Sequence, residues 1–338
     1  MQKTMLVDAV CNVHAHLREG EVMKPLIELA HQGGADIIGP MPNTTAGLTN
    51  PFSVHSYINA CNIYAGELGR DLKFLPIMMM TEQTTESEIT AAVESGIRDC
   101  KIYPYMRTTK SELGVKRYGN IIEKVKWAGK YGMKCHFHPE HPQMTFGNRD
   151  AEFAFLPLLY MFLQETEAII ISEHGTDARC IPHWKEMALY GRFYVTLTAH
   201  HLATNEDERF GDVRATCKPP IKTESDRLGL CDFVAEDHSW VMAGADDAPH
   251  NSKAKHVSQS KCACGAFTSP FLHQLYAHAL DKMIIAPRGW EKYVNFTSRN
   301  ARALHGLPNA TRMVKLVREP FQIPALYEVG SWTVESYG

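Results

Sequence analysis

The sequence predicts an α/β protein folded as a (β/α)8 barrel. Short runs rich in apolar and β-branched residues alternate with longer amphipathic stretches along all 338 residues, and no linker, repeat or low-complexity segment interrupts them. This repeated alternation is typical of a parallel barrel. The eight predicted strands are Met5–Val13, Asp36–Gly39, Lys73–Met79, Asp99–Tyr103, Met133–His138, Ala168–Glu173, Phe193–Thr198 and Trp240–Ala245.

Amphipathic stretches between and after these strands predict the helices. We expect one barrel domain over residues 1–338, with a short C-terminal extension from about residue 307 to residue 338. The predicted helices are Val22–His31, Ser53–Leu68, Glu86–Ser95, Asn120–Tyr131, Phe153–Gln164, Arg179–Tyr190, Glu224–Ala235, Pro270–Leu280 and Gly289–Leu304.

The composition limits the possible partners and compartments. A formal net charge of −3 gives no basic field for nucleic acid, which favours a small-molecule substrate. The N-terminus lacks a secretory signal pattern. The longest apolar segment, Ala154–Leu163, is about half the roughly 20 residues that cross a bilayer. Nine scattered cysteines fit reduced thiols. We therefore expect a cytoplasmic protein that binds neither membrane nor nucleic acid.

Polar residues of metal-ligand type lie where the predicted strands end. Active sites of barrel enzymes form at the carboxyl ends of the strands, so these side chains are expected to face one another. They are His14 and His16 after the first strand, Asn43 after the second, Lys101 in the fourth, His138 at the end of the fifth, His174 after the sixth and Asp246 after the eighth.

The pair His14-Ala15-His16 opens this series. Side chains alternate along a strand, so two histidines at this spacing point the same way and can reach one ion. An isolated pair of this kind is as often a surface feature as a site. With the downstream histidines and a carboxylate, however, the set has the donors that zinc prefers.

Lys101 is the unusual member, because a bare ammonium is costly to bury inside a strand. One interpretation is a Schiff-base lysine of an aldolase. Another is a carbamate formed with CO2, which would turn the cation into an anionic ligand between two metals. Only the carbamate explains the neighbouring histidines. A third interpretation gives Lys101 no functional role: its side chain would extend to the surface and place the ammonium in solvent.

The end of the eighth strand supplies two adjacent aspartates. Asp246 is the better candidate for a metal ligand, and Asp247 is expected to make a turn or cap contact. On the fifth strand His136 shares a face with His138. We favour His138 as the ligand because Pro139-Glu140 follows it.

Taken together, these segments resemble the dihydroorotase family of the amidohydrolase superfamily, a group of TIM barrels, and most of all its shorter class II enzymes. The resemblance extends over nearly the whole chain. The matching segments are His14-Ala15-His16-Leu17-Arg18, Met41-Pro42-Asn43-Thr44, Lys101-Ile102-Tyr103-Pro104 with Thr108-Thr109, His138-Pro139-Glu140, Glu173-His174 and Gly244-Ala245-Asp246-Asp247-Ala248-Pro249-His250.

The resemblance implies a centre with two Zn²⁺ or other divalent ions. His14, His16 and Asp246 would bind the first metal, and His138 and His174 the second. Lys101, as N6-carboxylysine, would bridge them. Asp246 would also be the catalytic residue, moving a proton to and from the amide nitrogen. The implied reaction is the reversible cyclisation of N-carbamoyl-L-aspartate to (S)-dihydroorotate and water in de novo pyrimidine synthesis. The resemblance also implies a homodimer.

The resemblance further implies residues that bind the substrate. Arg18, Asn43 and His250 match donors to its free carboxylate, and Thr108 and Thr109 lie on a loop expected to close over it. Two further contacts are less direct. Lys218 stands where class II enzymes often have a leucine that contacts substrate through its backbone. Gly265 lies in the segment Lys261–Phe267, which resembles a Cys/Gly-rich loop of the family but is one residue shorter.

Three other functions stay open at this point. Another cyclic amidohydrolase, such as a hydantoinase or allantoinase, would share the metals but differ in the substrate donors. A non-catalytic dihydroorotase-like partner protein would have lost ligands. A Schiff-base aldolase would use Lys101 alone. In addition, His201 matches a family histidine with a structural hydrogen-bonding role, which we expect here.

Overall fold

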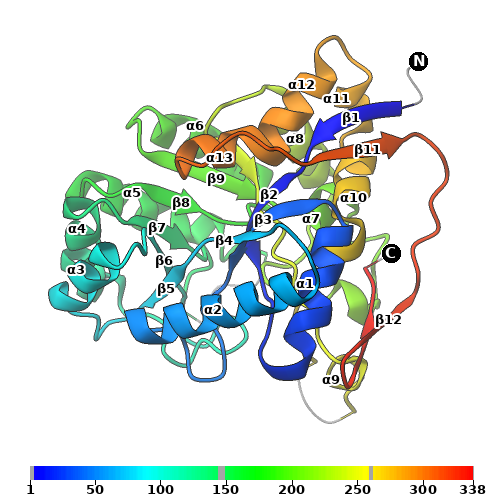
Figure 1. Ribbon diagram of the computed structural model, residues 1–338. Helices are drawn as coiled ribbons and strands as arrows, with labels where there is room; N and C mark the ends of the chain where they lie inside the picture. Colours follow the sequence, from blue (N-terminus) through cyan, green and yellow to red (C-terminus); the bar gives the residue numbers. More distant parts are fainter. Residues whose placement is uncertain (1–3, 144–148, 259–261, 338) are drawn as a thin grey trace.

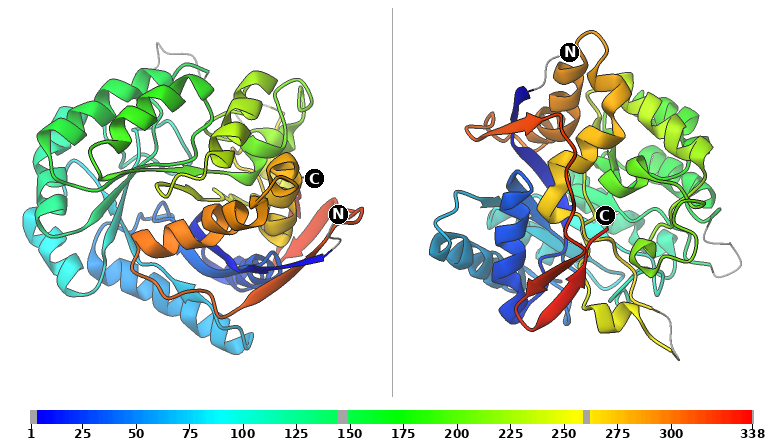
Figure 2. Two further views of the ribbon diagram at one scale, coloured as in Figure 1. Left: turned by 90° about the horizontal axis from the view of Figure 1, so that it is seen from above. Right: turned by 90° about the vertical axis from the view of Figure 1, so that its right-hand side faces the viewer.

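The strands form a barrel with the helices on its outside (Figures 1 and 2). The computed structural model describes residues 4–143, 149–258 and 262–337. A six-stranded parallel sheet in the order β10-β9-β8-β7-β6-β5 and a three-stranded parallel sheet β2-β3-β4 make up the wall. The strands are β2 (Val10–Ala15), β3 (Ala35–Pro40), β4 (Lys73–Phe74), β5 (Ile77–Met80), β6 (Asp99–Ile102), β7 (Lys134–Phe137), β8 (Ile170–Ser172), β9 (Phe193–Leu197) and β10 (Val241–Ala243).

Two seams join the sheets into the barrel. At the first, β5 continues β4 after Leu75-Pro76, so the two count as one of eight barrel strands. Proline has no N–H to give to a ladder, which explains why the strand breaks there. At the second seam Ala15 pairs with Asp247 in a parallel bridge, and Asn12 Oδ1 accepts a hydrogen bond of 2.9 Å from the Ala245 N–H. The predicted (β/α)8 barrel is therefore confirmed.

The covering helices begin where the sequence supplies capping side chains. Asn50 with Ser53, Thr85 with Glu88 and Thr223 with Asp226 each form a capping box, which satisfies backbone N–H groups of the first turn. These helices are α1 (Met23–Gln32), α2 (Pro51–Glu67), α3 (Glu86–Glu94), α4 (Ile122–Lys130), α5 (Leu156–Glu165), α6 (Ile181–Ala188) and α8 (Glu224–Ala235).

The interior of the barrel is a packed core. Its strands are buried on both faces, as parallel strands covered by helices must be. Apolar side chains from opposite strands meet inside, and Ala301 of the last helix joins them at the end where the strands begin. The members of this inner cluster are Cys11, Val13, Ile37, Leu75, Ile171, Met242 and Ala301.

Several predicted boundaries were wrong. Met5–Val13 is two strands, because only β2 belongs to the barrel and β1 (Thr4–Asp8) pairs instead with β11 (Met313–Val317). Lys73–Met79 is split at Pro76. The long helix predicted after the eighth strand is α12 (Gly289–Val294) and α13 (Asn300–Leu304), separated by a π-helical turn.

Short elements that the sequence did not indicate complete the fold. The helices that were not predicted are α7 (Ala199–Ala203), α9 (Ser252–Lys255) and α11 (Asp281–Ile284), whereas α10 (Leu272–Ala279) confirms the helix predicted over Pro270–Leu280. The C-terminal segment forms β11 and then a hairpin of β12 (Leu326–Val329) and β13 (Trp332–Glu335). Figure 1 shows β1 and β11 side by side at one edge of the molecule. Val334 of the hairpin bridges to Asn251, just after the eighth barrel strand.

All nine cysteines lie among the described residues and are free thiols, as predicted. Along the described chain we find no helix with the length and apolar character needed to cross a membrane.

Replacing Asn12 by Ala tests the second seam. The substitution leaves the buried Ala245 N–H without its acceptor, and we expect a loss of about 1–3 kcal/mol in the free energy of unfolding. Chemical denaturation measures this loss. Asn62→Ala, at an exposed position of α2, is the control. A change no larger than in the control would show that the side chain does not hold the seam.

Candidate metal centre and substrate pocket

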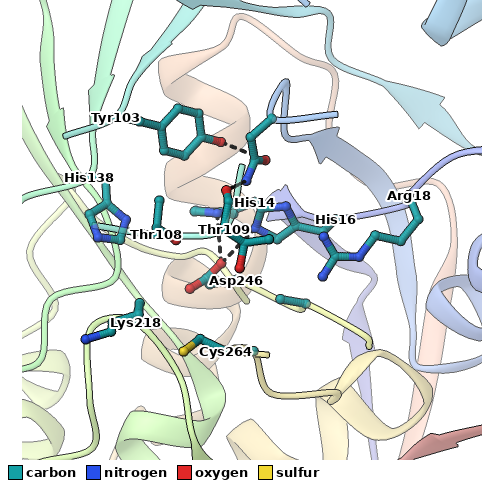
Figure 3. Close-up of a pocket in the computed structure, with 13 residues that line it drawn as sticks. His14, His16, Arg18, Tyr103, Thr108, Thr109, His138, Lys218, Asp246 and Cys264 are labelled. Carbon is teal, nitrogen blue, oxygen red and sulfur yellow. Dashed lines mark hydrogen bonds and ion pairs between the residues drawn. The ribbon is translucent and has the colours of Figure 1, made fainter. Parts of the chain in front are cut away.

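The predicted ligands come together at the carboxyl end of the barrel, and Figure 3 shows His14, His16, His138 and Asp246 among them. Because parallel strands all end at this face, residues far apart in sequence become neighbours. His14 lies near the end of β2, and His16 directly follows that strand. Lys101 is in β6, His138 follows β7, His174 follows β8 and Asp246 follows β10.

Three of them form a compact group. Asp246 Oδ1 lies 3.0 Å from His14 Nε2 and 3.2 Å from His16 Nε2. Ligand atoms of a tetrahedral zinc ion are separated by about 3.3 Å, given bonds of about 2.0–2.1 Å. Two imidazole nitrogens and a carboxylate oxygen at this spacing fit one divalent metal.

The electrostatics of this group suit ligation. Burial lowers the pKa of His14 and lowers that of His16 to about 4, so both imidazoles are neutral near pH 7. Burial alone would raise the pKa of Asp246, but the adjacent His14 and His16 outweigh it and hold that pKa well below its ordinary value. Neutral imidazole and ionised carboxylate are the forms that bind metals.

Lys101 lies beneath this group and is fully buried. Its amine pairs with Glu173, whose Oε2 is also 2.9 Å from His14 Nδ1. Burial lowers the pKa of Lys101 to about 7. The side chain does not reach solvent, so the structure excludes the alternative of a solvated lysine.

His138 and His174 form the neighbouring part of the site, with ring centroids 4.5 Å apart. His138 Nε2 lies 2.7 Å from Glu140 Oε2, an arrangement that orients the ring and leaves Nδ1 for another contact. His174 is fully buried, and neither ring nitrogen has a hydrogen-bond partner among the described residues. An unpartnered buried imidazole is costly unless a ligand completes it.

The backbone at the strand ends is turned in an uncommon way. Arg18, His174 and Asp246 have positive φ angles of 58°, 43° and 45°. Residues other than glycine rarely adopt this backbone conformation. Local contacts fix these turns: the His174 N–H donates to Thr196 Oγ1 at 2.8 Å. Strained residues of this kind gather at functional sites.

Asp247 makes the predicted cap contacts rather than facing the ligands. Its carboxylate accepts hydrogen bonds from the Ser269 N–H at 2.7 Å and the Ser269 hydroxyl at 2.6 Å. His201 likewise has both ring nitrogens bonded, to Thr198 Oγ1 and to the Pro219 carbonyl, which confirms its structural role.

A pocket opens above the ligand group (Figure 3). Most of the predicted site residues line it, while Lys101 and His174 lie buried below and His250 stands beside Arg18. The lining consists of His14, His16, Arg18, Asn43, Tyr103, Thr108, Thr109, His138, Lys218, Asp246, Ala248, Cys264 and Gly265.

Polar donors occupy one side of the pocket. Arg18 Nε donates to the Pro249 carbonyl at 2.8 Å, and its Nη2 lies 3.1 Å from His250 Nε2. Burial lowers the pKa of Arg18 to about 10, so the group stays cationic near neutral pH. Asn43 Nδ2 donates to the Thr109 carbonyl at 3.0 Å, which ties the loop to the pocket wall.

Sequence reasoning missed some residues of this site. Tyr103 donates to Asn43 Oδ1 at 3.0 Å, and its spacing from Lys101 already indicated a shared face. Glu173 and Glu140 stood in the matched motifs without a role. Ala248 and Cys264 carry no chemical signal that would mark them as lining residues.

Proteins with sequences similar to this chain carry the name of one family. No family model matches the chain. A probable dihydroorotase of Schizosaccharomyces pombe is 30% identical over 284 residues, covering 82% of this chain and 81% of that protein. A dihydroorotase of Cupriavidus necator is 30% identical over 331 residues, covering 95% and 92%. The chain belongs to the dihydroorotase family.

Solved structures support the fold of this family. A dihydroorotase of Saccharomyces cerevisiae superposes with a TM-score of 0.91 at 22% identity, covering 99% of this chain and 96% of that one. An L-hydantoinase of Arthrobacter aurescens gives 0.74 at 14% identity, covering 90% and 72%. The barrel is thus shared with other cyclic amidohydrolases, and the dihydroorotase is the more similar of the two.

Replacing His174 by Ala tests whether the unpartnered imidazole is a ligand. We expect this variant to lose bound divalent metal, measured by elemental analysis after dialysis, because ligation is what completes its buried nitrogens. His201→Ala is the matched control, since its ring nitrogens are bonded within the protein. Equal metal content in the two variants would contradict a ligand role for His174.

Proposed function

We propose that this protein is a dihydroorotase with a binuclear metal centre, which interconverts N-carbamoyl-L-aspartate and (S)-dihydroorotate plus water. One observation carries the proposal beyond family membership. A compact group of two histidines and one carboxylate, His14, His16 and Asp246, lies in the same pocket as the cationic fork of Arg18. Side chains that can bind a metal and a guanidinium that can bind a carboxylate therefore line the same pocket.

The proposed metal ligands follow from the donor set. His14, His16 and Asp246 would hold one divalent ion, and His138 and His174 a second. Lys101, as its carbamate formed with CO2, would join the two. The buried, unpartnered nitrogens of His174 and the enclosed amine of Lys101 fit such a centre. Two zinc ions would supply Lewis acidity and a water that is acidic enough to react near neutral pH.

Asp246 is the proposed proton carrier. In the hydrolytic direction a water oxygen bonds to the ring carbonyl carbon, the ring C–N bond breaks and the nitrogen takes up a proton. The Asp246 carboxylate lies in the pocket wall next to both strand-end histidines, where it can accept the water proton and pass it to that nitrogen. Cyclisation uses the same steps in reverse.

Substrate recognition is assigned to Arg18, Asn43 and His250. Arg18 offers a planar fork to the free carboxylate, with Asn43 and His250 beside it as further donors. The Tyr103 hydroxyl donates a hydrogen bond to Asn43 Oδ1. This bond fixes the orientation of the amide and therefore the direction in which its N–H groups point. The S. cerevisiae dihydroorotase is described in complex with 5-fluoroorotic acid, a ring carboxylic acid of this kind.

Loops complete the proposed substrate site. Thr108 and Thr109 lie on the loop that the Pro104–Val115 bridge closes, and they would exclude water from the reacting carbonyl. Lys218 and Gly265 line the remaining wall. As part of the same proposal, the enzyme works as one barrel domain in a cytoplasmic homodimer. The sequence pattern and composition support the single domain and the location, and the family supports the homodimer.

Turnover of dihydroorotate, followed by its ultraviolet absorbance, tests the proposal. We expect activity that a chelator abolishes and zinc restores. Lys101→Ala should lower kcat by at least about 10²-fold, because it removes an anionic group from the reaction centre. Retained activity after either change would contradict the mechanism. Covalent trapping of a substrate on Lys101 by borohydride would instead support an aldolase.

Replacing Arg18 tests substrate recognition separately from chemistry. Arg18→Met removes a charged hydrogen bond worth about 1.5–3 kcal/mol. We expect kcat/KM to fall by about 10- to 100-fold, mainly because KM rises. Arg18→Lys keeps the positive charge but loses the planar pair of donors, so its kcat/KM should lie between the values of the unmodified protein and Arg18→Met. Steady-state kinetics with dihydroorotate, and with hydantoin as a ring lacking the carboxylate, measure this. An equal effect on both rings would show that Arg18 does not read the carboxylate.

A further inference from the structure

A second cluster of metal-ligand side chains lies inside the barrel, away from the pocket. Asp99 opens β6, His136 lies in β7 and His305 follows α13 at the end where the strands begin. Asp99 Oδ1 is 3.0 Å from His136 Nε2 and 3.4 Å from His305 Nδ1. Asp99 and His136 are buried, and the His305 side chain is 2% exposed. None of the three lines the substrate pocket.

Both ring nitrogens of His136 lie next to a carboxylate oxygen. His136 Nδ1 lies 2.7 Å from Glu173 Oε1, while Nε2 lies 3.0 Å from Asp99 Oδ1. A neutral imidazole has a single N–H, so it can donate to only one of the two carboxylates. If that N–H goes to Glu173, then Nε2 and Asp99 Oδ1 are two acceptors in contact. A cation between them would satisfy both.

His305 adds an independent indication. Its side chain is almost fully enclosed, its Nδ1 has only the long 3.4 Å contact with Asp99 Oδ1, and Nε2 has no hydrogen-bond partner among the described residues. The ring stacks on His136 with centroids 6.0 Å apart, so that its Nδ1 is turned toward the same Asp99 oxygen. A buried imidazole with one long contact and one unsatisfied nitrogen costs free energy, and a bound cation would offset this cost.

The lysine beside Asp99 is only loosely paired with its carboxylate. Lys134 Nζ lies 3.4 Å from Asp99 Oδ1 and 3.5 Å from Asp99 Oδ2. These contacts are longer than an ordinary charge-assisted hydrogen bond of about 2.7–2.9 Å. Glu173, on the other side of His136, contributes a second carboxylate. Glu173 also pairs with the Lys101 amine, so the loose contact with Lys134 is the lysine contact of Asp99 itself.

We propose that Asp99, His136 and His305 bind a zinc ion, separate from the centre at the pocket. The donor separations of 3.0 and 3.4 Å match the spacing of about 3.3 Å in a tetrahedral zinc site. Imidazole and carboxylate donors select zinc over magnesium or calcium. Glu173 orients His136 through its other nitrogen, as carboxylates do in histidine-zinc sites. The ion ties the end of α13 to β6 and β7, a structural role independent of the proposed function.

Anomalous diffraction at the zinc absorption edge locates the ion in crystals of the unmodified protein grown with zinc. We expect a peak enclosed by Asp99, His136 and His305, in addition to any density at the pocket. Anomalous density confined to the pocket, with His136 bonded directly to Asp99, would overturn the proposal. Turnover of dihydroorotate by the same protein reports separately on the proposed function.

A variant measures the contribution of the third ligand. His305→Leu keeps the volume without a donor atom, and we expect it to bind one zinc ion fewer per chain than the unmodified protein. Turnover should change less than about twofold, since His305 does not contact the pocket residues. His273→Leu is the matched control, because that buried ring is bonded to Tyr293 and to the Asp8 carbonyl. Unchanged zinc content in His305→Leu would contradict the proposal.

Discussion

The position of the Asp246 carboxylate between two imidazoles is the constraint on which the rest of the site depends. A buried carboxylate is stable only with cationic or donating partners, and here Oδ1 lies within 3.2 Å of His14 and His16. To reach that point the backbone at Asp246 adopts a positive φ of 45°. Asp247 holds the turn by capping the segment at Ser269. The eighth strand end is therefore built as a unit, in which one aspartate faces the two histidines and the next holds the turn.

The strand ends were predictable because residue type and spacing carry their signal. His14 and His16 share a face through the alternation of a strand, and barrel topology brings the later histidines to the same end. Glu173 was not predictable in the same way. It lies next to His174 in sequence but points down the barrel toward Lys101 and His136, a direction set by the local turn rather than by its type.

The boundaries that failed have physical causes that a sequence pattern does not contain. Met5–Val13 is one apolar run, yet β1 leaves the barrel because its partner is β11, about 300 residues away. The long terminal helix breaks at a π-helical turn that packs against β2 and β10. Such choices depend on tertiary contacts, and local propensity does not predict them. These errors shift the ends of strands and helices but do not change their alternation along the chain. The predicted fold class was therefore correct.

The barrel alone does not determine what the pocket accepts. The hydantoinases share the fold with TM-scores of 0.74 and 0.68, and function resides in the site rather than in the scaffold. In this chain Arg18 lies two residues beyond His16, and its guanidinium donates to the carbonyl of Pro249 on the loop after β10. The same two strand ends that supply His16 and Asp246 therefore also position the cationic fork. For the proposed reaction this coupling would set the distance between the reacting carbonyl and the bound carboxylate, so a ring that lacks the carboxylate would lose its alignment as well as a contact.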